Sequence, residues 1–163
     1  MSILSLRHYP DPVLRRKAQP VRQIDPTVRR LVADMVDTMR HNSGVGLAAP
    51  QVGVSLRVAV IELPEEPVIV LINPQVVKRR GWRQVEEGCL SYPGYRGEIT
   101  RAEKIVIKAL NLDGETIRVK AEDLAAQALE HELDHLNGVL YIDHLESQNK
   151  LYPLETEPPQ QAD

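Results

Sequence analysis

The segment from Glu122 to Asn137 limits how this chain can fold more than any other, because it predicts a helix with two apolar faces. Successive helical side chains turn by about 100°. The first face is formed by Leu129, Leu133 and Leu136, the second by Leu124, Ala128, His131 and His135, and a narrow polar strip by Gln127, Glu130, Asp134 and Asn137. The first face suits the hydrophobic core, and the second suits the lining of a pocket. We therefore expect this helix at the centre of the fold.

A second helix is predicted near the N-terminus, after about 24 irregular residues that contain several prolines. Asp25 is a suitable N-cap and Pro26 suits the first helical position. An apolar stripe then recurs at helical spacing through Val28, Leu31, Val32, Met35, Val36 and Met39. The turn residues Asn42-Ser43-Gly44 end it.

The middle of the chain predicts β-strands. β-branched runs at 56–63, 68–73 and 75–80 are divided by Pro64, Pro67 and Pro74. Two further runs, 104–112 and 115–120, flank Asp113-Gly114, which indicates a tight hairpin. With the order helix, strands, helix, the predicted fold class is α+β. We expect mixed or antiparallel strands around the central helix, with the N-terminal helix beside them.

The length of 163 residues suggests one domain, for which we expect residues 1–146. Residues 147–163 are rich in Pro, Gln and acidic side chains, which predicts a flexible C-terminal tail. The net charge of −3 gives no sign of nucleic-acid binding, and no apolar run is long enough for a membrane span. Cys89 is the only cysteine, and no signal peptide is recognisable. We therefore expect a reducing, cytoplasmic location.

The central helix carries a candidate metal site, His131-Glu132-Leu133-Asp134-His135. Side chains four apart on a helix lie about 5–6 Å apart at Cβ, so His131 and His135 can share one ion. Glu132 lies beside the pair and can act as a general acid and base without being a ligand. The simpler interpretation is a polar helix whose histidines are solvated or hydrogen-bonded. The well-signalled helix around the motif favours the metal site.

A catalytic site of this kind needs a third protein ligand. In one metallopeptidase motif the third histidine would stand at Tyr141, and His144 comes three residues too late. The glutamates after His135 (Glu146, Glu155 and Glu157) lie on no convincing helix. Cys89 remains, flanked by turn residues, and its thiolate is a strong ligand. A small buried hydrophobe or a nucleophile are the other interpretations of Cys89.

The segment 44–53, GVGLAAPQVG, is the third unusual feature. It fits a loose dinucleotide-binding pattern, but a helix precedes it and Pro50 interrupts it, so we reject that interpretation. An ordinary connection between helix and strand would explain the glycines. The functional alternative is a bare backbone with which an extended peptide pairs as an added strand, with the Gln51 amide as a donor nearby.

Together, GVGLAAPQ (44–51), EGCLS (87–91) and HELDH (131–135) resemble the three motifs of the peptide deformylase family, in the same order and with similar spacing. The resemblance extends over about residues 1–146. It implies a metallohydrolase that removes the N-formyl group from formyl-methionyl nascent chains and releases formate, with Glu132 as general acid and base for a metal-bound water. Many members continue into a long C-terminal helix, whereas this chain ends in a Pro- and Gln-rich segment.

The resemblance also implies roles for individual residues. The metal ligands would be Cys89, His131 and His135, and the oxyanion donors would be Gln51 and the backbone N–H of Leu90. Val45 and Gly46 match the peptide-pairing segment, and Arg96 matches a basic position near the far end of the substrate. The methionine pocket would be lined by Val85, Leu124 and Ala128. Glu87 is grouped with the substrate-binding residues and is expected to pair with Arg101.

The ligand set suits Fe²⁺, Zn²⁺, Ni²⁺ or Co²⁺, and the resemblance favours Fe²⁺. Formyl-Met N-termini are the expected partners, transient ribosome contact is left open, and a monomer is expected. Two other functions compete: an endopeptidase with an unidentified third ligand, and a metal-stabilised binding module with a fourth ligand from Asp134, Glu132 or His144.

Overall fold

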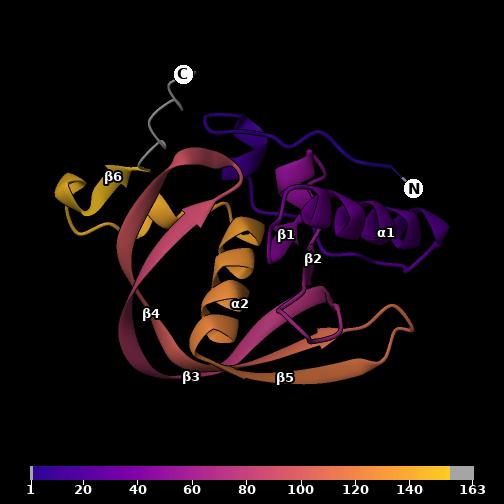
Figure 1. Ribbon diagram of the computed structural model, residues 1–163. Coiled ribbons are helices and arrows are strands. Elements are labelled where there is room, and N and C mark those ends of the chain that lie inside the picture. Colours follow the sequence, from indigo (N-terminus) through magenta and orange to yellow (C-terminus); the bar gives the residue numbers. More distant parts are fainter. Residues whose placement is uncertain (1, 155–163) are drawn as a thin grey trace.

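The computed structural model describes residues 2–154 and has the expected α+β architecture (Figure 1). The two α-helices are α1 (Pro26–His41) and α2 (Asp123–Leu136). The strands are β1 (Gly46–Ala48), β2 (Val58–Ile61), β3 (Ile69–Cys89), β4 (Tyr92–Leu110), β5 (Thr116–Glu122) and β6 (Leu151–Pro153). Short 3-10 turns cover Pro12–Arg15, Ala49–Val52, Tyr141–His144 and Gln148–Lys150. No helix in the described part is both long and apolar enough to cross a membrane.

The strands form one antiparallel sheet in the order β1-β2-β3-β4-β5, with β6 added to β4. The long strands β3 and β4 curve around α2 (Figure 1), and the hairpin predicted at Asp113-Gly114 joins β4 to β5. The expected break at Pro74 is wrong, because β3 runs through it. The β3–β4 register shifts between Ile72 and Gln75, and at such a bulge a proline without an N–H is tolerated.

Helix α2 lies at the centre, as its two apolar faces predicted. Its buried residues Ala126, Ala128, Leu129, Leu133 and Leu136 share a core with residues of β2, β3 and β4. Its polar strip does not face solvent as a whole. The buried Glu130 accepts hydrogen bonds from Arg79 of β3 and from the backbone N–H of Ala102 in β4. These contacts attach α2 to the curved strands on its polar side.

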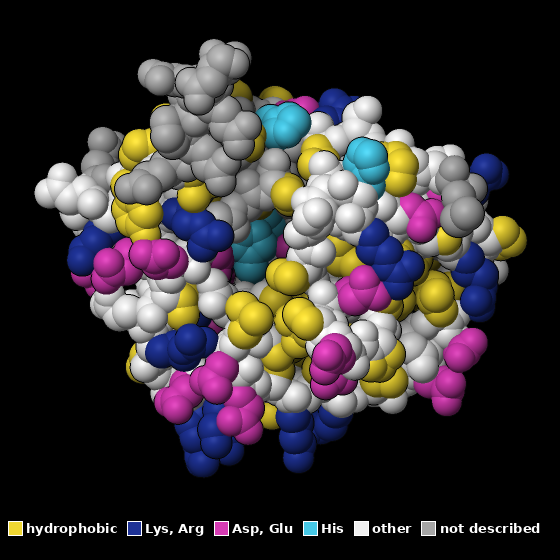
Figure 2. Space-filling model, viewed as in Figure 1, with side chains coloured by type: hydrophobic (Ala, Val, Ile, Leu, Met, Phe, Trp, Pro, Cys, Tyr) yellow, Lys and Arg dark blue, Asp and Glu magenta, His cyan; other side chains and the backbone are white. Residues whose placement is uncertain are grey.

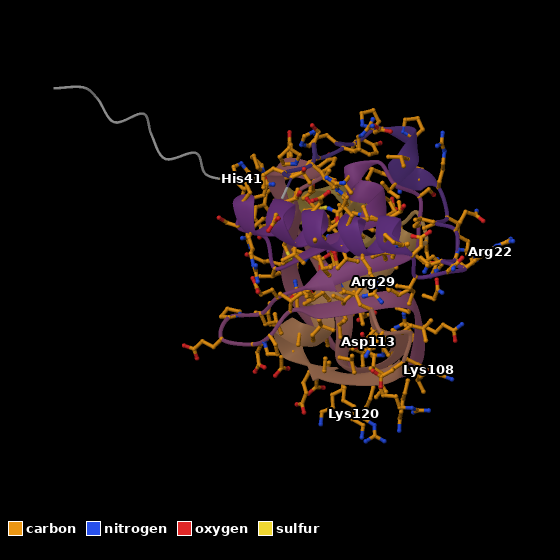
Figure 3. All side chains as sticks on the ribbon, turned by 90° about the vertical axis from the view of Figure 1, so that its right-hand side faces the viewer. Arg22, Arg29, His41, Lys108, Asp113 and Lys120 are labelled. Atoms are coloured by element: carbon orange, nitrogen blue, oxygen red, sulfur yellow. The ribbon has the colours of Figure 1, made fainter. Side chains whose placement is uncertain are left out.

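Helix α1 covers the other side of the short strands. Its predicted stripe is buried at Val28, Val32, Met35 and Met39, in a second core with residues of β1, β2 and β3. Strand β2 is buried on both faces, which explains its continuous apolar run. On the side seen in Figure 3, the guanidinium of Arg29 donates to the carbonyl of Leu112, next to Asp113. Helix α1 thereby also reaches the β4–β5 hairpin.

The residues expected to form a flexible tail are partly ordered in the sheet. β6 pairs with β4 at Tyr95, Arg96 and Gly97, and the backbone N–H of Leu154 donates to the carbonyl of Gly94. Composition could not reveal this strand, because its pairing partner lies more than 50 residues upstream. The remaining tail, residues 155–163, lies outside the described residues.

Gly138 ends α2, as the sequence predicted. The N–H of Val139 donates to the carbonyl of Asp134, and the N–H of Gly138 donates to that of His135. Together these bonds form a Schellman motif, which requires a positive φ at the residue after the C-cap. Gly138 has φ +75°, and a Cβ there would lie 2.6 Å from the carbonyl oxygen of Arg15.

Gly138→Ala should therefore destabilise the protein for two reasons. The left-handed conformation costs a non-glycine residue about 1–2 kcal/mol, and the overlap with Arg15 adds roughly 1 kcal/mol or more. Gly114→Ala is the matched control, because Gly114 has φ +76° and open space around it. Urea unfolding should show the larger loss for Gly138→Ala. Equal losses would mean that the contact with Arg15 has no effect.

Candidate active site

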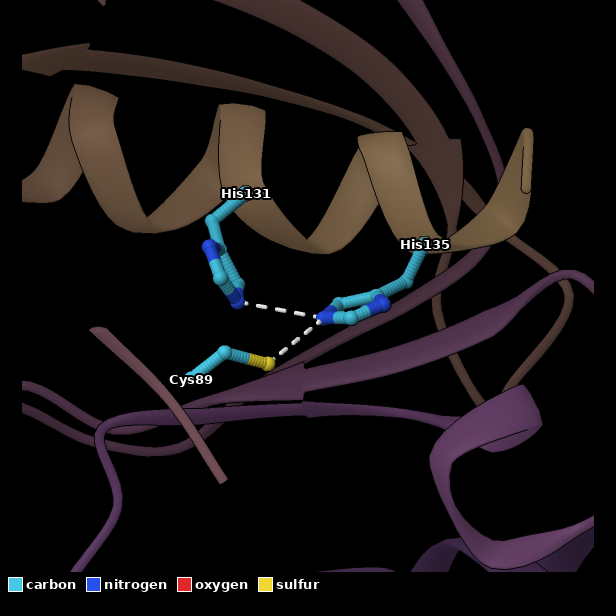
Figure 4. Close-up of side chains that lie close together, drawn as sticks. All are labelled: Cys89, His131 and His135. Atoms are coloured by element: carbon cyan, nitrogen blue, oxygen red, sulfur yellow. Dashed lines mark hydrogen bonds between the residues drawn. The ribbon is translucent and has the colours of Figure 1, made fainter. Parts of the chain in front are cut away.

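The three predicted metal ligands lie together beside α2 (Figure 4). His131 and His135 project from successive turns of α2, and Cys89 reaches them from the last position of β3. The turn predicted around Cys89 is present, because Cys89 pairs with Tyr92 where β3 turns back into β4. Residues 46 positions apart in sequence thus meet at one point.

The spacing of the three side chains fits one shared ion. Nε2 of His131 lies 3.1 Å from Nε2 of His135, and Sγ of Cys89 lies 3.3 Å from that same nitrogen. Tetrahedral coordination at ~2.05 Å for nitrogen and ~2.3 Å for sulfur would separate such atoms by about 3.3–3.6 Å. Burial lowers the pKa of His135 well below its usual range, which favours the neutral imidazole that binds metals.

A buried ion-pair network holds His131 in place. Nδ1 of His131 lies 2.6 Å from Glu87, whose carboxylate also accepts two hydrogen bonds from Arg101. Arg101 donates a further bond to Asp134 on α2. Burial raises the pKa of Glu87, but His131 and Arg101 outweigh burial and lower it to about 2. The expected pair of Glu87 and Arg101 is therefore present, and Glu87 is positioned to orient a ligand.

Glu132 is buried next to the ligand cluster. Its side chain is 2% exposed, and Oε1 lies 3.9 Å from Nε2 of His131. Within residues 2–154 its other oxygen, Oε2, has no hydrogen-bond partner. Burial raises the pKa of Glu132 to about 7, although the charge of His131 opposes the shift. A carboxyl group with such a pKa can both accept and return a proton near neutral pH.

Gln51 and Leu90 lie beside Cys89 and line the same cavity. Oε1 of Gln51 accepts from the N–H of Ala48, which leaves its amide NH₂ directed at Cys89 and Ser91, 3.6 Å from Sγ and 3.2 Å from Oγ. Leu90 belongs to the turn that follows Cys89 and lines the same cavity. Both residues can therefore present N–H donors near a ligand of the metal site.

A cavity of about 630 Å³ opens over the cluster, and Figure 2 shows a histidine side chain at the bottom of a hollow in this face. Its lining includes the predicted residues Val45, Gly46, Arg96, Leu124 and Ala128, together with Glu87, His131 and Glu132.

Strand β1 is an edge strand of the sheet and pairs only with β2 in the described part. Its free edge can accept an extended peptide.

Val85 differs from expectation. It does not line the cavity but packs with Ile99 and Tyr141 in a separate buried cluster. Direct contact between Val85 and a substrate is therefore not supported. Its apolar character suited a pocket as well as a core, so the sequence could not separate the two.

The cavity also includes residues that the sequence did not predict to lie there: Leu6, His8, Gln127 and Leu154. Leu6 and His8 come from the irregular N-terminal segment and Leu154 from the tail, where no periodic pattern exists.

Tyr141 stands where a longer peptidase motif would have its third histidine. Its ring stacks on that of His131, with ring centroids 6.5 Å apart. Asp134 is bound to Arg101 and His144, so it is not free to act as a fourth ligand.

Gly46 gives a direct test of the position of Glu132. A Cβ at Gly46 would lie 3.1–3.2 Å from the Glu132 side chain, so Gly46→Ala should displace the carboxylate. Misplacement of a reacting group by about 1 Å can cost up to about 10²-fold. We expect turnover to fall roughly 10- to 10²-fold with the metal content unchanged. Wild-type turnover in this variant would show that the displacement does not matter.

Comparisons with known proteins agree with this geometry. The family model described as polypeptide deformylase matches residues 3–151. A peptide deformylase of Dehalococcoides mccartyi is 52% identical over 155 residues, which cover 94% of this chain and 93% of the relative. The crystal structure of a peptide deformylase from Legionella pneumophila matches with a TM-score of 0.88 at 43% identity, covering 91% of this chain and 89% of that one. A deformylase from Synechococcus elongatus, solved in complex with actinonin, matches with a TM-score of 0.88 at 40% identity, covering 92% and 82%. The chain belongs to the peptide deformylase family.

Proposed function

We propose that this protein is a metal-dependent deformylase that hydrolyses the N-formyl amide of formyl-methionyl peptides and releases formate. The observation that carries the proposal is the Cys89, His131 and His135 cluster at the base of a cavity, with the buried Glu132 carboxylate beside it. Family membership supports the reaction class, and the named relatives are all deformylases.

The proposed mechanism assigns each group a separate step. A divalent ion held by the three ligands would lower the pKa of a coordinated water and polarise the formyl oxygen. Glu132 takes the proton of the attacking water and later delivers it to the leaving α-amine. The Gln51 amide and the N–H of Leu90 stabilise the negative charge that develops on the formyl oxygen. Tyr92 lines the cavity and packs edge to face against the buried Tyr141.

The cavity supports recognition of an extended peptide that begins with an apolar residue. The backbone around Val45 and Gly46 can pair with the substrate main chain along the free edge of β1. Leu124 and Ala128 supply apolar surface from α2, next to the metal ligands. Arg96 is exposed on β4 at the cavity and suits carbonyl or carboxylate groups further along the peptide.

The nature of the metal and the setting of the reaction are also proposals. Fe²⁺ is the proposed native metal, with Zn²⁺, Ni²⁺ and Co²⁺ as substitutes that the same ligands can bind. Nascent formyl-Met chains in the cytoplasm are the proposed substrates, and a monomer is sufficient for the site described. Transient ribosome contact and a separate role for residues 147–163 stay predictions.

The assay that tests the function is formate release from formyl-Met-Ala-Ser by anaerobically purified, metal-loaded protein. Acetyl-Met-Ala-Ser is the matched control, because its acyl group is one methyl larger. We expect rapid release of formate and much slower release of acetate. No formate from protein with one bound metal per chain would overturn the proposal.

Cys89→Ser separates this proposal from an endopeptidase with a different third ligand. Loss of the thiolate should weaken metal binding on the order of 10²-fold, since a serine hydroxyl is a poor ligand for these ions. Metal content after dialysis and formate release should fall together. An endopeptidase would instead keep its metal and cleave unformylated internal bonds in this variant.

A further inference from the structure

The outer face of the sheet, on the side away from α2, carries an unusual concentration of positive charge. Directly paired residues share a face, so the register identifies this side. The basic face, as we call it, consists of Lys78, Arg80, Lys104, Lys108, Arg118 and Lys120 on the adjacent strands β3, β4 and β5. All six side chains are exposed. Figure 3 shows Lys108 and Lys120 pointing away from the body on the same side, and basic side chains project along the lower edge in Figure 2.

The charges on the basic face are not neutralised within the protein. In the part of the chain that the structure describes, none of the six forms an ion pair. Glu122, opposite Lys104, is the one acidic residue in the same rows. The chain as a whole has a net charge of −3, so this face opposes the charge of the rest of the molecule.

Two of the cross-strand pairs place like charges directly opposite each other. Arg80 pairs with Lys104, and Lys108 pairs with Arg118. Like charges in such positions destabilise a sheet. An exposed sheet face could accommodate neutral or alternating charges without this cost. The arrangement therefore points to an external polyanion that offsets the repulsion.

An exposed aromatic side chain stands at one end of the basic face. Trp82 of β3 is 68% exposed and lies opposite Ala102, one row beyond Arg80 and Lys104. Beyond Trp82 the same side becomes acidic at Glu86 and Glu98, which marks the boundary of the face. Basic side chains that contact phosphates, next to an aromatic surface that stacks on a base, are the elements of sequence-independent nucleic-acid binding.

We propose that the basic face binds RNA through its phosphate backbone, with Trp82 against an exposed base or helix end. A membrane surface fits less well, because few apolar side chains that could insert into lipid accompany the charges. The net charge alone gives no sign of nucleic-acid binding, whereas the distribution of charge over the strands supports it. The proposal is independent of the deformylase function, since Val85 and Glu87 face the opposite side of β3.

The test measures binding of a fluorescent 20-base-pair RNA with a short single-stranded overhang, by anisotropy at several salt concentrations. The variant is Lys108→Gln/Arg118→Gln, and the matched control is Lys17→Gln/Arg30→Gln, which removes the same charge from exposed sites elsewhere. We expect the first variant to bind about 10-fold or more weakly and to reduce the salt slope by about 2. The control should bind like the wild type.

Three outcomes would overturn the proposal: no binding at about 50 mM salt, equal weakening in both variants, or equally tight binding to anionic lipid vesicles or polyglutamate. Thermal unfolding provides a second measurement. Because Lys108 and Arg118 repel each other, Lys108→Gln/Arg118→Gln should unfold at the same or a higher temperature than the wild type. Both variants should release formate from a short formyl peptide at the wild-type rate, which separates a failure of RNA binding from a failure of folding or of the proposed enzyme function.

Discussion

Glu132→Gln should reduce formate release by about 10²–10⁴-fold, the range typical of a positioned general acid and base. Glutamine keeps the shape of the side chain but cannot accept the proton of the attacking water. Glu132 lies 3.9 Å from Nε2 of His131 and is not one of the three clustered ligands, so the metal content should stay at the wild-type level. Turnover of formyl-Met-Ala-Ser, with metal analysis of the same sample, measures both quantities.

Glu86→Gln is the matched control for this prediction. Glu86 lines the same cavity, but its side chain is exposed and belongs to the outward-facing row of β3. Removal of its charge tests whether any negative charge near the cavity supports turnover. We expect a change of less than about 3-fold, because exposed charges interact weakly through water. A similar loss in both variants would contradict the assigned role of Glu132.

The part of the site on α2 was predictable from sequence. His131, Glu132 and His135 lie within one helix, where the rotation per residue fixes their relative positions. The apolar residues of this helix predicted a central α2, and the core that it shares with β2, β3 and β4 confirms it. Local periodicity was sufficient for both conclusions. Cys89, on a different element, became a candidate only because the other possible ligands failed, and the resemblance to a known family then supported it.

Other parts of the fold depend on pairing between distant segments, which no local pattern reports. Residues 81–89 and 92–103 alternate poorly because charged side chains face both sides, yet they form most of β3 and β4. Strand β6 forms by pairing with Tyr95, Arg96 and Gly97 of β4, which lie far upstream in the sequence. The lining of the cavity could not be predicted completely for a similar reason. Leu6, His8 and Leu154 belong to it but come from segments without a periodic pattern.

The buried network around Arg101 is the clearest example of such long-range dependence, and its removal should have the largest effect on stability. Arg101 is 2% exposed and connects Glu87 of β3 with Asp134 of α2. Arg101→Met leaves both carboxylates without their cation. Loss of one partner from a buried ion pair typically costs about 3–5 kcal/mol. Urea unfolding should show a decrease of this size in the free energy of unfolding.

Arg15→Met is the matched control, because Arg15 makes two hydrogen bonds to Asp143 at the surface. Both partners of that pair are more than one-third exposed, so water replaces the lost contacts. We expect a loss of about 0–1 kcal/mol. Equal losses in the two variants would show that burial of Arg101 adds nothing to the strength of its network.

The same network should also couple stability to metal binding. Glu87 orients His131 and is itself held by Arg101, so Arg101→Met should weaken metal affinity by about 10–100-fold, the usual effect of losing such an outer partner. In the double variant Arg101→Met/Glu87→Gln the unpaired charge at Glu87 is gone. Its loss of stability should therefore be smaller than the sum of the two single losses, because residues in one network are not additive. Additive losses would mean that Arg101 acts on the fold independently of Glu87.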